Sequence, residues 1–236
     1  MYNLEAAFKQ IISRRRSAFD FDPTRTIEDS KLKTLQELCL RAPSAYNSQP
    51  FRCVLITDDQ TKKDLAHVMM SIRNARRVTR ASITAVFLAD TECWKNFDEL
   101  PERENATYEA IKRKENGIKF MGGYGGASMK NAAIATSKLA PTAIPNDPVV
   151  WALKSTMLFV DHYILTCAAL GLSTSPMEGF DEHRARSVVN ASGRYFCPLV
   201  VPTGYGIGID ENSKLSERKY PEQVFFRNKL PPEYSE

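Results

Sequence analysis

This chain of 236 residues has few of the residues that bind metals or form disulfides: it has three histidines and five cysteines. The cysteines, at positions 39, 53, 93, 167 and 197, lie far apart and form no C-x-x-C pair. Each histidine stands alone on an expected helix, which is more typical of a packed or surface side chain than of a metal ligand. The sequence therefore favours neither a zinc site nor a disulfide framework, and we expect no bound metal. Reduced, mostly buried thiols in a cytoplasmic setting suit the pattern best.

Common nucleotide-binding and hydrolase motifs are also absent. The chain has no G-x-x-x-x-G-K-[ST], no G-x-S-x-G and no H-E-x-x-H. Its glycine cluster at 122–126 lacks the G-x-G-x-x-G spacing after a strand. These absences argue against a P-loop NTPase, an α/β hydrolase, a zincin and a Rossmann dinucleotide enzyme.

Long hydrophobic runs are missing too. The longest, Met157 to Leu170, contains Asp161 and His162 and is shorter than the ~20 residues of a membrane-spanning helix, so we expect no membrane span. The amphipathic segment 1–16 ends in arginines, which suits either the first helix of the fold or a mitochondrial presequence. Glu5 and the lack of a cleavage-like stretch favour the first helix.

The hydrophobic fraction of 43% is enough for a sizeable core, in one large domain or two small ones. The net charge of +4 is mild, but arginines cluster at 14–16 and at 73–80, and a basic pair stands at 218–219. Such clusters suggest anions bound at particular places rather than a polyanion surface. The run 73–80 lacks interleaved aromatic residues, so a solvated helix face is a simpler interpretation than a nucleic-acid patch. Asn74 and Arg77 could instead donate to a carbonyl-bearing heterocycle.

Apolar residues at helical spacing predict helices at about 2–15, 28–41, 59–70 and 149–170, and then a short helix that ends near Asn190. The helix at 149–170 is nearly apolar throughout, so we expect it to be central and buried, with Gly171 at its C-terminal end. Short apolar runs predict strands at 51–57, 82–89 and 197–204. The segment 94–148, charged and then rich in Gly and Pro, is typical of a mobile cover, and the polar residues 210–236 of an arm.

Three local patterns each allow two interpretations. The basic residues before Ser17 either complement the dipole of the first helix or form a phosphate clamp with the serine hydroxyl. The loop Pro43–Pro50 is either a helix-to-strand connection capped by its own Ser and Asn or a holder of a polar group. In Met177-Glu178-Gly179, the glycine either serves a turn or lets the backbone approach a flat ring, where an N–H can hydrogen-bond a ring nitrogen.

Together, and in this order, these patterns resemble the FMN-dependent nitroreductase family over most of the chain apart from the middle insert. The segment Arg15-Arg16-Ser17 resembles the R-R-S motif of the family, and Pro43 to Phe51 resembles its P-S-x-x-N-x-Q-P-W loop. The segment Pro176 to Phe180 resembles its P-I-E-G-F, and Gly204-Tyr205 with Arg218-Lys219 resembles its carboxy-terminal G-Y and basic pair.

The resemblance implies one α+β domain over 1–236, in which helices surround a central, mostly antiparallel sheet. It also implies an intertwined homodimer with one FMN in each of two interface pockets. Asn74 and Arg77 would then meet the pyrimidine edge of the flavin, and Glu178 and Gly179 its central nitrogen through their backbone. The phosphate and ribityl end would be held by Arg15, Arg16, Ser17, Arg218 and Lys219. Further contacts would come from Pro176 and Met177 and, in the partner chain, from Pro43, Ser44, Ala45, Asn47 and Gln49.

Two positions depart from the family pattern. Two residues after Ser17 the family often has a basic residue near the flavin, and here Phe19 stands there. The second hydroxyl of the family's loop is replaced by Ala45. Both changes remove a polar contact from the implied pocket, while the phosphate clamp and the Glu178-Gly179 segment stay.

The activity implied by the resemblance is ping-pong transfer of hydride from NADH or NADPH through flavin N5 to a small acceptor such as a nitroaromatic or a quinone. No side chain is needed as a covalent nucleophile; Arg77 and the Glu178 backbone would tune the flavin. Relatives of this family with other covers over the site remove halogens or oxidise heterocycles, so the insert 94–148 leaves those chemistries open. A non-enzymatic regulator that binds flavin or nucleic acid through the 73–80 face is a third possibility.

Overall fold

A computed structural model describes residues 3–93, 148–209 and 215–231. Its sheet contains β1 (Phe51–Ile56), β2 (Ile83–Asp90), β3 (Ser173–Thr174) and β4 (Tyr195–Gly204), in the order β1-β2-β4-β3. Each neighbouring pair is antiparallel, with registers such as Phe51 opposite Ala89 and Ile83 opposite Thr203. The predicted α+β fold with an antiparallel central sheet is therefore confirmed, and β4 begins two residues before the predicted strand at 197–204.

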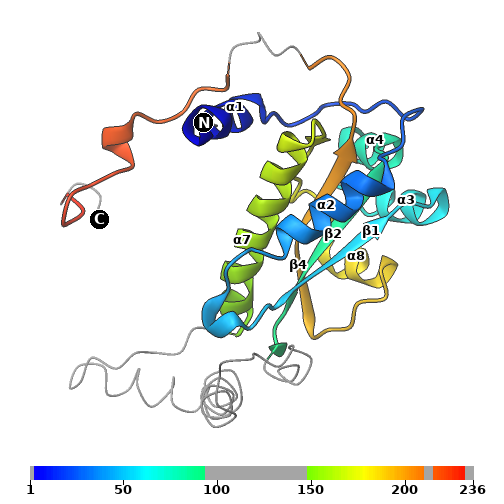
Figure 1. The fold of residues 1–236 in the computed structure, drawn as a ribbon. Helices are drawn as coiled ribbons and strands as arrows, with labels where there is room; N and C mark the ends of the chain where they lie inside the picture. Colours follow the sequence, from blue (N-terminus) through cyan, green and yellow to red (C-terminus); the bar gives the residue numbers. More distant parts are fainter. Residues whose placement is uncertain (1–2, 94–147, 210–214, 232–236) are drawn as a thin grey trace, which may run out of the picture.

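Helices cover both faces of this sheet (Figure 1). On one face lie α2 (Asp29–Cys39) and α7 (Pro148–Ala169), and on the other lie α3 (Asp59–Ala66), α4 (Ile72–Arg80) and α8 (Glu182–Val188). Every residue of β2 is buried, as a strand must be when helices pack above and below it. Two hydrophobic cores result, one on each side of the sheet.

Aromatic side chains fasten α7 to the sheet. The rings of Phe51 and Phe159 are stacked with their centroids 4.3 Å apart, and the ring of Phe87 meets Phe159 edge-on at 5.9 Å. The ring centroids of Tyr163 and Phe87 are 5.1 Å apart, and the Tyr163 hydroxyl donates to Thr203 Oγ1 at 2.9 Å. Offset and edge-to-face contacts of this kind add about 0.5–1.5 kcal/mol each beyond the burial of apolar area. The position of α7 on the sheet is thus well defined.

Burial of α7 differs from the sequence expectation. We expected a central, buried helix, but only the face towards the sheet is buried in the single chain. On the outer face, Val150, Met157 and Leu158 are 44%, 41% and 47% exposed. A run that is apolar all around a helix predicts burial all around, so the outer face remains uncovered by the described part of this chain. The predicted end of the helix is confirmed, because α7 ends at Ala169 and Gly171, two residues later, has a φ of 71°.

The helix predicted at 59–70 is shorter and is followed by a second helix. α3 ends at Ala66, and α4 begins after Ser71, whose side chain accepts a hydrogen bond from Asn74 N. Lys62 on α3 is buried and donates to Ala81 O at 2.8 Å and Ser82 O at 2.9 Å, just beyond the end of α4. These bonds fix α3 and α4 relative to each other.

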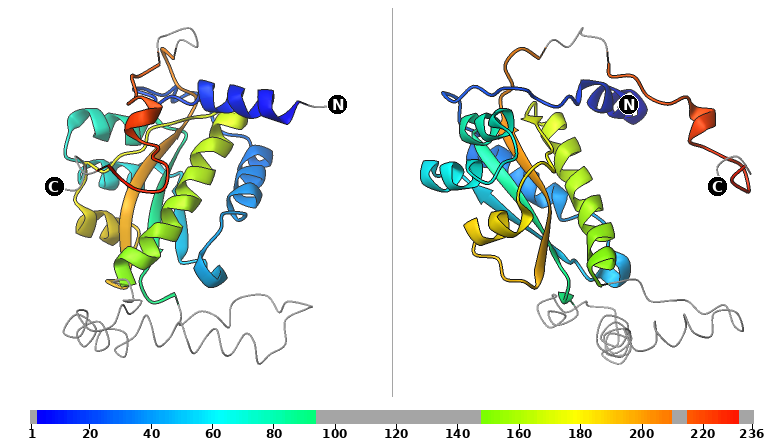
Figure 2. Two further views of the ribbon diagram at one scale, coloured as in Figure 1. Left: turned by 90° about the vertical axis from the view of Figure 1, so that its left-hand side faces the viewer. Right: turned by 180° about the vertical axis from the view of Figure 1, so that it is seen from behind.

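The two ends of the described chain differ in placement: α1 lies against α7, whereas the C-terminal arm extends away from the body (Figure 1 and the right-hand view of Figure 2). The first helix, predicted at about 2–15, is confirmed as α1 (Leu4–Arg14), and none of its residues is buried. The arm is described from 215 to 231, contains the short helix η3 (Pro221–Gln223), and leaves Phe225 80% exposed. The insert expected to act as a cover lies outside the described residues except for Pro148, as do the glycine cluster at 122–126 and the ends of the arm.

The thiols behave as predicted. All five cysteines are free, four are buried and Cys53 is half-buried. Burial raises the pKa of Cys39 and of Cys197 to about 12. These groups are protonated at neutral pH and are poor nucleophiles. No helix in the described ranges has the length and hydrophobicity needed to cross a membrane.

Candidate functional site

The residues that follow α1 form an extra edge beside the sheet. Ser17 pairs with Thr174 of β3 in a parallel bridge, and Ala18 N donates to Thr174 O at 2.9 Å. Phe21 pairs with Gly206, beyond the end of β4. Ala18 and Phe21 are completely buried in a small third core with Ala81. The chain leaving the basic end of α1 is therefore held at the end of the sheet where β2 begins.

Arg15 and Arg16 lie half-buried at the C-terminal end of α1, next to the exposed Ser17. The Arg16 Nη1 group donates to Ser13 O and Arg15 O, which satisfies helix-end carbonyls as the simpler interpretation expects. Its Nε atom, however, is buried and meets no acceptor among the described residues. A buried N–H of a cation is costly when unpaired, so an anion here would supply a missing partner. This atom supports the phosphate-clamp interpretation.

Asn74 and Arg77 join the segment after α1 to the Glu178-Gly179 segment. Arg77 Nη1 donates to Asn74 Oδ1 at 3.2 Å, and Arg77 Nε donates to Phe19 O at 3.5 Å. Asn74 Nδ2 lies 3.5 Å from Gly179 O. α4 places both side chains one turn apart on the same face, as an i, i+3 spacing requires. The structure thus brings together three sequence segments that the motifs singled out.

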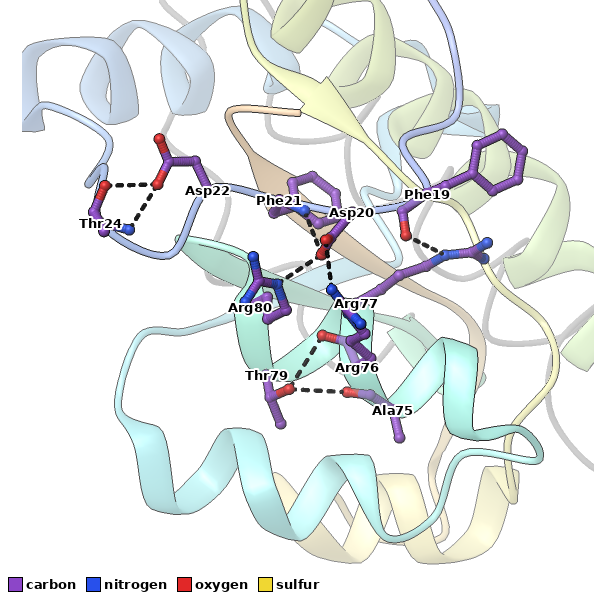
Figure 3. Close-up of polar contacts among 10 residues, drawn as sticks. All are labelled: Phe19, Asp20, Phe21, Asp22, Thr24, Ala75, Arg76, Arg77, Thr79 and Arg80. Atoms are coloured by element: carbon purple, nitrogen blue, oxygen red, sulfur yellow. Dashed lines mark hydrogen bonds and ion pairs between the residues drawn. The ribbon is translucent and has the colours of Figure 1, made fainter. Parts of the chain in front are cut away.

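The neighbouring arginines of α4 are paired with Asp20 (Figure 3). Arg76 Nη2 lies 2.8 Å from Asp20 Oδ2, and Arg80 Nε lies 2.7 Å from Asp20 Oδ1. Burial acts to raise the pKa of Asp20, but the hydrogen bonds from Arg76 and Arg80 outweigh it and hold that pKa below its usual 3.8. The single carboxylate of Asp20 offsets one positive charge of the 73–80 run and holds two of its arginines against the body of the protein, which weakens the nucleic-acid interpretation. We had given Asp20 no role, because nothing in its immediate sequence indicates these distant partners.

The Pro176–Phe180 segment presents unused backbone donors. Met177 pairs with Val200 of β4, and Gly179 O accepts from Met70 N at 2.9 Å, so the segment is held on both sides. The N–H groups of Glu178 and Gly179 donate to no acceptor among the residues that the structure describes. A Cβ atom added at Gly179 would lie 3.1 Å from Asn74 Nδ2, so this glycine is needed for a close approach. Such a segment can receive a flat polar ring.

An open hollow borders Glu178. Its volume is about 380 Å³, and Pro176, Glu178 and the outer face of α7 line it. A second hollow of about 450 Å³ continues past Glu178 and Met157 towards Phe180 and Phe196. Both hollows include exposed side chains of α7. They are therefore open on the outer side of α7, where the described residues of this chain provide no cover.

The Pro43–Pro50 loop lies at the opposite end of the sheet from Ser17. Its residues precede Phe51, which pairs with Ala89 near the end of β2, whereas Ser17 borders the end where β2 begins. Six residues of β2 separate these ends, or roughly 20 Å at ~3.3 Å per residue. Within one chain, the loop residues Pro43, Ser44, Ala45, Asn47 and Gln49 therefore do not meet the basic cluster of Arg15 and Arg16.

The loop itself has a fixed conformation. Ser44 Oγ accepts from Gln49 N at 3.0 Å, and Ser44 O accepts from Asn47 N at 2.9 Å. Asn47 and Gln49 have φ values of 57° and 43°, a left-handed conformation that few residues other than glycine adopt easily. The self-capping interpretation of this loop is thus correct as far as Ser44 is concerned. The strained backbone at Asn47 and Gln49 is compatible with an additional binding role.

Arg218 and Lys219 are not brought to the other candidate residues within this chain. Both are exposed on the arm, and Arg218 Nη1 donates to the carbonyl groups of Ser216 at 3.3 Å and Glu217 at 2.9 Å. The arm extends away from the body (Figure 2), so any contact of these side chains with a shared site requires another placement of the arm or a second chain.

Comparison with known proteins agrees with the motifs. An NADH dehydrogenase from Thermus thermophilus is 28% identical over 186 residues, which cover 76% of this chain and 77% of that protein. An oxygen-insensitive NAD(P)H nitroreductase from Salmonella typhimurium is 26% identical over 219 residues, covering 88% and 93%. These relatives match along most of their own length.

Solved structures share the fold. One from Bacillus subtilis, assigned as a nitroreductase, has a TM-score of 0.74 at 19% identity and covers 94% of this chain and 99% of its own. One from Exiguobacterium sibiricum, also assigned as a nitroreductase and solved in complex with FMN, has a TM-score of 0.72 at 19% identity and covers 93% and 96%. The sequence profile of the nitroreductase family matches residues 12–205, which include the basic cluster, the proline-bounded loop and the Glu178-Gly179 segment. The prediction made from these motifs is confirmed: the chain belongs to the nitroreductase family.

Proposed function

We propose that this protein is an FMN-dependent NAD(P)H oxidoreductase that works as a homodimer and reduces nitroaromatics, quinones or similar small acceptors by a ping-pong mechanism. The observation that carries the proposal is the pair of unused N–H groups at Glu178 and Gly179, next to Asn74 and Arg77. This arrangement offers hydrogen-bond donors along one edge of a flat heterocycle. The names of the NAD(P)H nitroreductase relative and of the FMN-bound structural neighbour support the choice of donor and cofactor.

The phosphate end of FMN suits the basic cluster. Arg15, Arg16 and Ser17 offer two guanidinium groups and a hydroxyl, and Arg16 Nε is the buried donor that has no acceptor of its own. Arginine matches phosphate oxygens with a planar fork of donors, and charged hydrogen bonds are stronger than neutral ones. Arg218 and Lys219 would add positive charge near the phosphate if the arm, of this chain or of its partner, packs against this end of the site.

The ring end of FMN suits the segment across from it. Asn74 and Arg77 would donate to the pyrimidine carbonyl groups, and the backbone of Glu178 and Gly179 would meet the central nitrogen. Pro176 and Met177 position this backbone, since Met177 N donates to Val200 O at 3.0 Å. The absence of a Cβ atom at Gly179 leaves the space beside Asn74 that a ring needs.

A second copy of the chain would complete each site. The outer face of α7 bears the exposed apolar residues Val150, Met157 and Leu158, and α1 exposes Leu4 and Phe8. Exposed apolar surface of this extent marks an interaction face. In the dimer, residues Pro43, Ser44, Ala45, Asn47 and Gln49 of the partner would close over the cofactor, because their own basic cluster lies at the far end of the sheet.

When bound, FMN would accept hydride from NADH or NADPH and deliver electrons to the acceptor, so the protein supplies binding, orientation and electrostatics. Arg77 would stabilise the negative charge that gathers at the pyrimidine edge on reduction, because its guanidinium has no carboxylate partner among the described residues. Asn74 orients Arg77 by accepting its hydrogen bond, and the apolar outer face of α7 would limit access of water to the flavin. No side chain needs to act as a nucleophile, and the buried thiols are unsuited to do so.

The decisive experiment is spectroscopic. The purified protein should be yellow, with the absorption of FMN, and anaerobic NADH or NADPH should bleach it. Re-oxidation by a nitroaromatic or a quinone should restore the colour. Double-reciprocal plots of initial rate against NAD(P)H concentration, made at several acceptor concentrations, should give parallel lines if the mechanism is ping-pong. Preference for halogenated phenols over these acceptors would redirect the proposal to dehalogenation, whereas a colourless protein that binds no added FMN would refute it.

A further inference from the structure

Phe19 is an exposed aromatic residue in an otherwise fixed segment. Its side chain is 78% exposed, whereas Ala18 and Phe21 on either side are fully buried. The backbone around it is held by Ala18 N donating to Thr174 O at 2.9 Å and by Ile207 N donating to Asp20 O at 3.1 Å. The backbone that carries Phe19 is therefore fixed to the body of the protein, while its side chain lies on the surface.

The ring of Phe19 lies against the guanidinium of Arg77. Arg77 Cζ is 5.2 Å from the ring centroid, within the range of a cation–π contact. The carbonyl oxygen of the same phenylalanine accepts from Arg77 Nε at 3.5 Å (Figure 3). Asn74 Oδ1 accepts from Nη1 on the other side at 3.2 Å. A guanidinium has five N–H groups, and apart from these two bonds the described residues offer it no acceptor.

The contrast with the adjacent arginines shows what this contact does. Arg76 and Arg80 are both paired with the Asp20 carboxylate, which orients them and offsets part of their charge. Arg77 is oriented by an aromatic ring, a carbonyl and an amide, all of which are neutral. Its direction is thus restricted while its full positive charge and most of its donors remain available.

We propose that Phe19 is a positioning residue for Arg77: it holds the guanidinium beside Asn74 without neutralising it, and thereby raises the reduction potential of the bound flavin. This inference rests on the proposed function, since it requires FMN to meet Arg77. The expectation follows because a fixed positive charge stabilises the extra negative charge of a reduced ring more than a mobile, solvated one does.

Two substitutions separate the ring from mere bulk. Phe19→Leu keeps an apolar side chain but removes the π face, and Phe19→Tyr retains it. Because the side chain is exposed, neither change should alter the thermal midpoint appreciably. The reduction potential of the bound FMN should be more negative in Phe19→Leu than in the wild type, and in Phe19→Tyr it should equal the wild-type value. In an Arg77→Gln background, Phe19→Leu should cause no further change.

The contact can also be tested without cofactor. In the apoprotein, the Arg77 Nε–H resonance, assigned with Arg77→Gln, should carry an upfield ring-current shift that is lost in Phe19→Leu and kept in Phe19→Tyr. An unchanged resonance and an unchanged potential in Phe19→Leu would overturn the inference, as would an equal change of potential in the Arg77→Gln background. If the wild-type protein binds no FMN, the proposed function fails and the redox role of Phe19 with it, and the apoprotein resonance then decides whether Phe19 positions Arg77.

Discussion

Single residues at the two ends of the proposed cofactor site are constrained in different ways. Arg16 keeps a buried donor without an acceptor, which is a cost that a bound anion would relieve. Gly179 keeps a space that any other residue would fill, because its Cβ would lie 3.1 Å from Asn74 Nδ2. Arg16 contributes positive charge, and Gly179 contributes space for the ring. Substituting Arg16 should therefore weaken phosphate binding, whereas substituting Gly179 should obstruct the ring.

Arg16→Ala should weaken FMN binding while leaving the fold intact. A hydrogen bond to a charged group contributes about 1.5–3 kcal/mol, which corresponds to a roughly 10- to 100-fold loss of affinity. Fluorescence titration of the apoprotein with FMN measures this change. Arg14→Ala is the matched control, since Arg14 is exposed two residues earlier on the same helix end and is not one of the proposed phosphate contacts. Equal affinities of wild type and Arg16→Ala would argue against the phosphate clamp.

Gly179→Ala should displace Asn74 and reduce FMN affinity, and Gly179→Val should abolish binding by crowding the ring. Gly193→Ala is the control, because a Cβ there meets nothing within 4 Å. Absorption spectra after gel filtration report bound FMN, and circular dichroism reports the fold. A Gly179→Val protein that retains its full complement of FMN would contradict the placement of the ring.

The sequence alone predicted Arg16, Asn74, Arg77 and Gly179 as site residues, because each lies in a short pattern with a chemical purpose. They could not reveal the contact of Phe19 with Arg77, which joins residues far apart in sequence. Phe19 was noted only as a departure from the family pattern. The role that we propose for it follows from tertiary geometry, namely the contact of its ring with the Arg77 guanidinium.

At the scale of elements, Asp20 ties α4 to the segment that follows α1. The two ion pairs with Arg76 and Arg80 are partly exposed, so each should contribute about 0.2–1 kcal/mol. Because the pKa of Asp20 is lowered in the folded state, this stabilisation is present above the usual value of 3.8 and is lost as pH falls through the lowered pKa.

Asp20→Asn should therefore destabilise the protein at neutral pH and have little effect in strong acid. Urea unfolding midpoints of wild type and variant should differ at about pH 7 and should approach each other as the pH is lowered from about 4 towards about 2. Glu37→Gln, which changes an exposed carboxylate of α2, should show no such convergence. A constant difference between wild type and Asp20→Asn across this pH range would show that the ion pairs do not stabilise α4.

Helix and strand positions followed from periodicity for α1, α2, α7 and the longer strands. The division between α3 and α4 was missed because the apolar pattern continues through Met69 and Met70, and the cap that restarts the helix is the single side chain of Ser71. The outer face of α7 was expected in the core because an apolar sequence predicts burial without specifying what covers the helix.

At the scale of the whole molecule, that outer face is where we propose that two copies of the chain associate. Leu158→Asp should place a charge on the proposed interface, shift the protein from dimer to monomer and reduce FMN retention, since each site would lose the partner's loop. Light scattering after size exclusion measures the mass. His183→Glu, on the exposed side of α8 across the sheet, should leave the dimer intact. A Leu158→Asp protein that stays dimeric would exclude α7 from the interface.

The separation of the Pro43–Pro50 loop from the basic cluster has a genetic consequence. If each site takes its loop from one subunit and its ring-binding backbone from the other, defects in the two parts belong to different complementation groups. A Ser44→Ala/Asn47→Ala chain and a Gly179→Val chain, each deficient alone, should regain activity when co-expressed, because every mixed dimer has one site that carries both defects and one that carries neither. Failure of such a pair to complement, with mixed dimers verified by mass, would mean that each subunit builds its site alone.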